Sequence, residues 1–273
     1  MKFLLKELLR RPMSIDAACC CSKGRVRAVN EDNYYFDGRY ASSGGAGYEG
    51  ILRTSFRMPD LSAQKGRLFA VFDGLGGSDY GDAASYASAV AASDYLNVRG
   101  NMDVSDIRSS LDALYRHMDR AVSRKAKALG TGDMGSTAVS AYFFADHVWC
   151  SNAGDSRCYL FRDGELSLLS KAHTGEEFLM MFGLGGSKPP LTQYLGAGSV
   201  SRPLVPSHND AAVQRGDLYL LCSDGLTDML SDHRIEKILN ASRDPEEAAG
   251  ILAEAANERG GRDNFTVIVM QVS

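Results

Sequence analysis

The chain has 273 residues, of which 44% are hydrophobic and 23% charged, a composition typical of a folded globular protein with a sizeable core. The formal net charge of −4 gives no overall basic footprint, so a nucleic-acid partner is not expected. The six cysteines lack the CxxC pairs of zinc sites, and no secretion signal precedes them, so we expect a reducing, cytoplasmic location.

Residues 1–14 form a basic and apolar segment, which we interpret as a short N-terminal extension. Lys6 and Glu7 interrupt its apolar run, so it makes a poor signal peptide, and it is too short to span a bilayer. A short docking helix or frayed terminus is favoured over contact with a membrane surface. We expect residues 15–273 to form one domain, a monomer without an integral membrane segment.

In the first half of the chain, two strand patterns precede two helical patterns. The strands are predicted at residues 28–36 and 66–74, and a helix rich in small residues at 83–98. A longer helix is predicted at 103–129, where Asp103 can act as the N-terminal cap. Its apolar face combines four residues at helical spacing: Ile107, Leu111, Leu114 and Met118.

Strand patterns dominate the second half. They are predicted at 136–144, 147–152, 157–169 (a hairpin), 217–225 and 264–272. Between the last two, a helix is predicted to begin at the cap Asp244, followed by Pro245 and by Glu247 for a capping box. Its inward face is expected to carry Ile251, Leu252 and Ala255.

Two stretches, 40–65 and 171–190, are rich in Gly, Ser or Pro and show no regular pattern. Strand patterns that need partners lie on both sides of each stretch, so we interpret them as functional loops of one domain. Hairpins together with separate helices indicate the α+β class rather than a doubly wound parallel sheet.

Acidic residues stand at the ends of several predicted strands, next to a glycine, an amide or another small residue. They are Glu31, Asp32, Asp73, Asp155, Asp224 and Asp263. An Asp-Gly turn explains any one of them. If Glu31 and Asp32 count as one site, five such sites at one rim of a sheet would repel one another unless a cation compensated them. Oxygen ligands favour Mg²⁺ or Mn²⁺. A neighbouring glycine would let its carbonyl act as a further ligand.

Seven motifs occur in the order found in metal-dependent protein Ser/Thr phosphatases, the PPM class or type 2C. They are "RAVNED", "VFDGLGG", "GSTAVSAYF", "NAGDSRCYLF", "LTQYLG", "LLCSDGLTD" and "RDNFTVIV". The chain resembles this family from about Ile15 to Val272, and its bacterial-type members in particular. The resemblance implies a four-layer αββα sandwich, two antiparallel sheets packed face to face with helices outside. It also implies hydrolysis of phosphoserine and phosphothreonine in proteins by a metal-bridging hydroxide.

The resemblance also implies roles for individual residues. Asp73 would bridge two Mn²⁺ or Mg²⁺ ions, with the Gly74 carbonyl on one of them. Asp224 and Asp263 would complete the first ion, and Glu31 would serve the second. Further roles fall to Asp32 as a supporting acid, Arg27 as the phosphate-binding arginine and Asp133 as a ligand of a third, weaker ion. The fork geometry of an arginine suits phosphate oxygens.

Some features depart from the family or leave alternatives open. Leu75 stands where many eukaryotic members carry a histidine proposed as general acid, so no protein acid is evident. Asp155 is interpreted as mainly architectural, in a tight turn between strands.

Cys19 and Arg25 have the C-x5-R spacing of cysteine-dependent phosphatases, but Val26 follows and the segment is expected to continue as a strand. A third alternative is a catalytically inactive phosphatase-like scaffold, although the four metal carboxylates are all present. Expected partners are a phosphoprotein substrate and a Ser/Thr kinase or its targets.

Overall fold

The computed structural model describes residues 13–42, 51–57, 66–76, 80–100, 102–181, 189–197 and 203–273. The docking helix expected within 1–14 lies outside the described residues, apart from the last two positions. Much of the two predicted loops, 40–65 and 171–190, also lies outside them.

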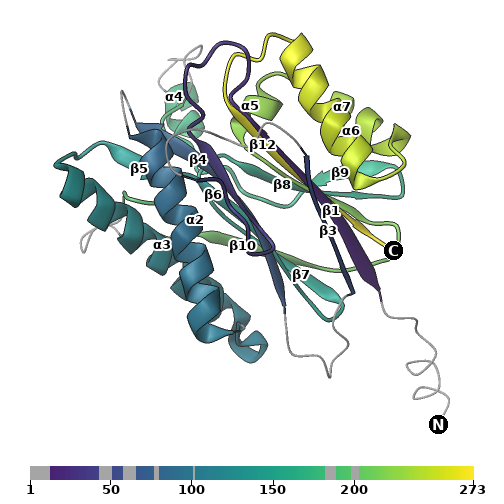
Figure 1. Ribbon diagram of the computed structural model, residues 1–273, viewed down its shortest axis with the longest axis horizontal. Coiled ribbons are helices and arrows are strands. Elements are labelled where there is room, and N and C mark those ends of the chain that lie inside the picture. Colours follow the sequence, from purple (N-terminus) through teal and green to yellow (C-terminus); the bar gives the residue numbers. More distant parts are fainter. Residues whose placement is uncertain are drawn as a thin grey trace.

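Twelve described strands form two antiparallel sheets, which confirms the α+β sandwich (Figure 1). The first sheet, in spatial order, contains β3 (Ile51–Arg57), β1 (Ser14–Ser22), β12 (Phe265–Val272), β11 (Leu218–Cys222), β8 (Arg157–Arg162) and β9 (Glu165–Leu168). The second contains β10 (Ser207–Ala212), β7 (His147–Ala153), β6 (Ala138–Phe144), β4 (Arg67–Gly76) and β2 (Asp32–Phe36), with the short β5 (Met134–Ser136) paired to the end of β4.

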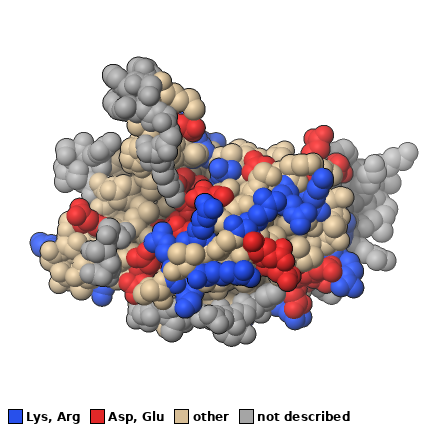
Figure 2. Space-filling model, turned by 90° about the horizontal axis from the view of Figure 1, so that it is seen from above, with Lys and Arg blue, Asp and Glu red and all other residues tan. Residues whose placement is uncertain are grey.

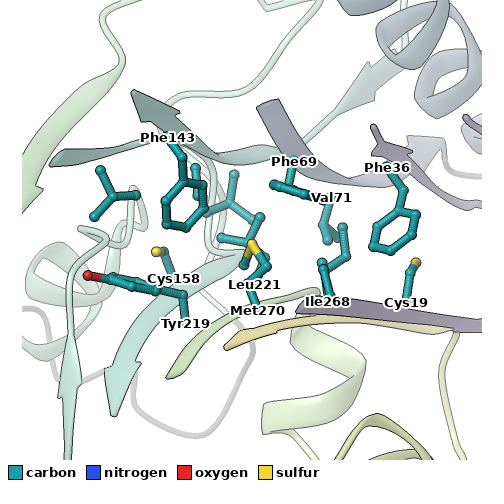
Figure 3. Packing of buried hydrophobic residues seen from close by; sticks show 14 of the residues in the cluster. Cys19, Phe36, Phe69, Val71, Phe143, Cys158, Tyr219, Leu221, Ile268 and Met270 are labelled. Carbon is teal, nitrogen blue, oxygen red and sulfur yellow. The ribbon is translucent and has the colours of Figure 1, made fainter. Parts of the chain in front are cut away.

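The inner faces of the two sheets enclose the central core (Figure 3). Phe36, Phe69 and Phe143 of the second sheet point toward the first sheet, and adjacent rings pack edge to face. Tyr219 and Met270 face them from the first sheet, and all five side chains are fully buried. Burial on this scale supplies most of the free energy that holds two sheets face to face.

Helices cover the outer face of each sheet (Figure 1). The second sheet is covered by α2 (Gly81–Arg99) and α3 (Ile107–Leu129), which the 3₁₀ turn η1 (Val104–Asp106) precedes. The first sheet is covered by α5 (Asp224–Thr227), α6 (Asp232–Ala241) and α7 (Pro245–Glu258), and the short α4 spans Glu176–Met181. Because both faces of the central strands are covered, β12 is buried at every position except Gln271.

The helix predictions are confirmed, with two differences. Asp103 caps η1 by accepting a hydrogen bond from the backbone N–H of Ser105, and Asp106 caps α3 itself. Leu252 is fully buried in α7 as expected, but Ile251 is 36% exposed, so the prediction that it faces inward was wrong. Ile251 precedes Leu252 by one residue, and consecutive helical positions diverge by about 100°.

The strands of the structure differ from the predicted pattern in three places. Val26 was expected in a continuing strand, but residues 23–31 form a turn and a loop between β1 and β2. Gly24 has a φ of +73°, a left-handed conformation that ends the strand pattern there. Strand β3 lies within the stretch interpreted as a loop, and β10 was not anticipated. Both are edge strands with polar residues, which weakens the alternating pattern on which sequence prediction relies.

Among the residues that the structure describes, no helix has the length and apolar character needed to cross a bilayer. All six cysteines are buried and none forms a disulfide.

Candidate metal centre

The acidic residues gather at one rim because strand pairing brings their strand ends there. Asp32 begins β2 and lies directly opposite Asp73 of β4. Cys222 ends β11 opposite Val267, so the following Asp224 leaves the sheet beside the start of β12. Asp263 stands just before β12. This rim lies at the top of Figure 1, where the β1–β2 loop and α5 meet.

Glu31 and Gly74 converge on Gly81, the first residue of α2. The backbone N–H of Gly74 donates to the Glu31 carbonyl at 3.2 Å. A Cβ atom on Gly81 would lie 2.5 Å from Glu31 Oε1 and 2.9 Å from the Gly74 carbonyl oxygen. A Cβ atom on Gly74 would overlap the Gly81 carbonyl. Glycine at both positions therefore lets a carboxylate oxygen and a carbonyl oxygen, both predicted metal ligands, approach one small space.

The Asp73 side chain lies partly buried next to the carboxylate of Asp224. Burial raises the pKa of Asp73 well above its usual range, and the charge of Asp224 and a hydrogen bond to it raise the pKa further. Thr137 fixes the Asp73 backbone from both sides: its N–H donates to the Asp73 carbonyl at 2.8 Å, and its hydroxyl accepts from the Asp73 N–H at 3.1 Å. Two carboxylates held this close are stabilised by a proton or by a cation.

Asp32 lies beneath this pair and is buried. Ser223 and Thr266 each donate a hydroxyl hydrogen bond to its Oδ2, at 2.7 and 2.8 Å. Its Oδ1 is buried and has no hydrogen-bond partner among the residues that the structure describes. Burial, together with the charges of Asp224 and Asp263, raises the pKa of Asp32 to about 7, although the two hydroxyls oppose this shift.

Arg27 lies at the edge of the acidic group, in the β1–β2 loop. Its Nη2 is 2.8 Å from Asp263 Oδ2, and its Nη1 is 3.9 Å from Glu31 Oε2. The Arg27 side chain is 47% exposed, so part of the guanidinium faces solvent. Burial raises the pKa of Glu31. The charge of Arg27 and a hydrogen bond from the backbone N–H of Gly81 partly offset this increase.

Asn264 was not singled out from the sequence, yet it organises the loop that carries Arg27 and Glu31. Its side-chain oxygen accepts from the Glu31 N–H at 2.8 Å. Its amide nitrogen donates to the carbonyls of Lys23 and Val29, at 3.0 and 2.9 Å. Asn264 is buried, and its side-chain oxygen and nitrogen are both hydrogen-bonded, as a buried amide requires. Only the structure reveals these partners, because they lie more than 230 residues away in the chain.

Two further predicted residues occupy the margin of the site. Asp155 lies in the turn between β7 and β8, as predicted, and its charge is the smallest of the contributions that raise the pKa of Asp73. Asp133 is exposed just before β5. Within the described part of the chain its carboxylate makes no hydrogen bond or ion pair, and the structure does not bring it into contact with Asp224.

The chemistry of this group fits a hard divalent cation. Its donors are carboxylate and carbonyl oxygens. The pKa values of Asp32 and Asp73 are raised by burial and, to a lesser extent, by neighbouring carboxylates, and Asp32 has a buried oxygen that is unsatisfied within the described part of the chain. Among the described residues, no set of three or more His, Cys, Asp or Glu side chains surrounds a single point at coordination distance. Instead, Asp73 is paired with Asp224, and Asp263 forms an ion pair with Arg27. The metal-ligand assignments therefore remain predictions.

The raised pKa of Asp32 predicts that stability in EDTA falls as pH rises from about 5 to 7.5. The folded state holds a proton that the unfolded chain has lost above its ordinary pKa near 4, so raising pH favours unfolding. We expect the midpoint of thermal unfolding to fall by on the order of 5 °C across this range. The Asp32→Asn variant should show a markedly flatter pH profile, and an unchanged profile would contradict the assignment.

Replacing Asn264 should disturb the site through the loop. We expect Asn264→Ala to lower stability by about 2–3 kcal/mol, since the Glu31 N–H and two carbonyls lose their partner. The Asn209→Ala variant serves as control, because Asn209 is exposed in β10. Its amide nitrogen donates to the Leu169 carbonyl and its side-chain oxygen accepts from the adjacent Asp210 N–H, and we expect their loss to cost less than about 1 kcal/mol. Urea unfolding of both variants measures the difference, and equal stabilities would contradict the role given to Asn264.

Two antiparallel sheets packed face to face between helices, with an acidic, arginine-edged centre at one rim, define the architecture of the PPM phosphatases. The protein phosphatase 2C family profile matches residues 49–178. The solved catalytic domain of the Ser/Thr protein phosphatase PstP, in complex with two manganese ions, is 30% identical, with a TM-score of 0.73 over 95% of this chain and 99% of that domain. The chain belongs to the protein phosphatase 2C family.

Two bacterial relatives extend the comparison. PstP of Mycobacterium tuberculosis is 34% identical over 213 residues, which cover 76% of this chain but only 40% of PstP. The Ser/Thr phosphatase stp of Listeria innocua is 27% identical over 256 residues, 91% of this chain and 92% of that protein. The chain thus corresponds to less than half of the mycobacterial protein and to nearly all of the Listeria protein.

Proposed function

We propose that the chain is a metal-dependent phosphatase that hydrolyses phosphoserine and phosphothreonine in proteins. The observation that carries this proposal is the convergence of the Glu31 carboxylate and the Gly74 carbonyl on Gly81, beside the Asp73–Asp224 pair. Membership in the family and the manganese complex of the PstP domain support the same activity.

The proposed ion ligands are those that the family resemblance implies. Asp73 and Asp224 would hold one ion with Asp263, and Glu31, Asp73 and the Gly74 carbonyl would hold the other. When bound, such ions supply Lewis-acid charge and an activated water nucleophile for phosphate ester hydrolysis. Mn²⁺ and Mg²⁺ both suit this oxygen donor set.

Arg27 is the proposed phosphate-binding residue, and its place at the edge of the acidic group suits this role. Its guanidinium is partly exposed and bonded to Asp263, so it can present further N–H donors to two phosphate oxygens. Asp32 positions Ser223 and Thr266 behind the site rather than contacting substrate. Leu75 carries no acidic proton, so leaving-group protonation falls to solvent rather than to this strand.

The proposal also includes a third ion, an opposing kinase, a monomeric state and a cytoplasmic location. Asp133 would serve a third, weaker ion once the loop before β5 approaches Asp224. A Ser/Thr kinase would act on the same phosphoproteins in the opposite direction. We also propose that the protein is a monomer and works in the cytoplasm, where its six buried free cysteines would stay reduced.

Cysteine-based catalysis is disfavoured by the structure. Cys19 lies within β1, between Leu52 of β3 and Ile268 of β12, and is buried. Burial raises the pKa of its thiol, which opposes formation of the thiolate nucleophile.

Hydrolysis of a phosphothreonine peptide with Mn²⁺, with and without EDTA, tests the proposal. We expect phosphate release that EDTA abolishes and excess Mn²⁺ restores, with no loss after iodoacetamide treatment. An inactive protein that binds the peptide would support the scaffold alternative instead. EDTA-resistant, iodoacetamide-sensitive turnover would contradict the metal-dependent mechanism.

A further inference from the structure

A cluster of basic side chains borders the acidic centre although the chain as a whole is acidic. Residues 22–30 contain three basic residues and no acid, and residues 259–262 contain two basic residues and no acid. The five residues are Lys23, Arg25, Arg27, Arg259 and Arg262, and all are exposed. We call Lys23, Arg25, Arg259 and Arg262 the basic rim. Arg27 is kept apart from it as the proposed phosphate ligand.

The two loops that carry the basic rim are joined by their backbones. The N–H groups of Arg25 and Val26 donate to the Gly261 carbonyl, at 2.8 and 3.3 Å. A Cβ atom on Gly24 would lie 2.7 Å from the same carbonyl oxygen, so the backbones touch without intervening side chains. The loops therefore present their charges together rather than as independent mobile segments.

The four side chains of the basic rim form no ion pair within the described part of the fold. Arg27 pairs with Asp263, but the structure assigns no ion pair or hydrogen-bonded side-chain partner to the four rim side chains among the described residues. Two acids flank that loop: Glu258, exposed at the end of α7 just before Arg259, and Asp263, just after Arg262, whose carboxylate pairs with Arg27. Figure 2 looks down on the face at the top of Figure 1, where basic side chains gather across the middle beside acidic ones.

The same loop also exposes apolar surface. Val26 is 66% exposed and Val29 48% exposed, on either side of Arg27. Exposed valines between basic residues suit contact with an extended peptide, whose backbone and small side chains would cover them. The combination favours a polypeptide over a small phosphate ester as the molecule that meets this surface.

We infer that the basic rim binds acidic side chains that flank the phosphorylated residue of the substrate. This inference rests on the proposed phosphatase function and adds a specificity for phosphopeptides rich in Asp or Glu. Arg27 and Asp263 link the rim directly to the metal centre, so flanking carboxylates would reach the rim when the phosphate reaches Arg27. Complementary surface charge contributes mainly to encounter and selectivity, and it weakens with salt.

Two phosphothreonine peptides of equal length, with three flanking Glu residues or three flanking Gln residues, test this inference. We expect the wild-type kcat/KM to favour the Glu peptide about five- to ten-fold at low salt. The Arg25→Gln/Arg262→Gln variant should bring the ratio close to one, mainly through KM. The Arg108→Gln/Lys237→Gln variant removes two exposed charges from α3 and α6 and should keep the wild-type ratio.

The outcomes separate this inference from the function on which it rests. Equal kcat/KM for both peptides, or a ratio that the rim variant leaves unchanged, would overturn the inference while leaving the phosphatase activity intact. If neither peptide is hydrolysed, the proposed function fails. Fluorescence anisotropy of a labelled Glu-rich peptide in EDTA then tests the rim alone. About five-fold weaker binding by the rim variant is expected, and equal binding would overturn the inference.

Discussion

Asp73→Asn should reduce hydrolysis of a phosphothreonine peptide in saturating Mn²⁺ by on the order of 1,000-fold, about 4 kcal/mol of transition-state stabilisation. Asp73 is the proposed bridge between two ions, and an amide cannot replace the charge of a shared carboxylate. The same substitution should leave the fold intact, because it removes one of two carboxylates that repel each other and keeps the side-chain volume. Asp224→Asn should have a similar effect.

The matched control for these variants is Asp163→Asn. Asp163 is exposed in the β8–β9 turn with a φ of +53°, a conformation that asparagine also accepts. Its activity should equal that of the wild type within experimental error. Wild-type turnover by both purified Asp73→Asn and Asp224→Asn would show that this carboxylate pair is not part of the catalytic centre.

Gly81→Ala is expected to weaken metal binding and activity although it replaces no carboxylate. The new Cβ would lie 2.5 Å from Glu31 Oε1 and 2.9 Å from the Gly74 carbonyl, so both oxygens would have to move. Substitutions that displace ligands without removing them commonly cost 10–100-fold in metal affinity, and we expect a loss of about that size. The Mn²⁺ concentration that gives half-maximal activity measures it.

Gly132→Ala provides the control for this change. Gly132 lies on the approach to β5, and a Cβ there would meet nothing within 4 Å. We expect the Mn²⁺ dependence of Gly132→Ala to match that of the wild type. If Gly81→Ala and Gly132→Ala behave alike, the close approach at Gly81 has no role in shaping the site.

The sequence predicted the fold and most of the acidic centre because these depend on local patterns. Strands such as β4 and β11 are apolar runs that end in Asp-Gly, so both the strand and the acid at its end can be recognised locally. Hairpins and separate helices then indicated the α+β class, and the family motifs implied two antiparallel sheets packed face to face.

Long-range contacts explain what the sequence did not predict. Asn264 shapes a loop that is more than 230 residues away, and Gly81 matters because Glu31 and Gly74 approach it in space. Edge strand β3 carries too little apolar alternation to be distinguished from a loop. The basic rim joins two loops from opposite ends of the chain, and its charges disappear in an overall net charge of −4.

The most direct test of the central claim is the stoichiometry of Mn²⁺ binding, measured by isothermal titration calorimetry on the chelator-treated protein. The assignment of Asp73 as a shared ligand predicts at least two Mn²⁺ ions per wild-type chain and loss of this binding in Asp73→Asn, with Asp163→Asn unaffected. Equal stoichiometry and affinity in wild-type and Asp73→Asn proteins would contradict the account.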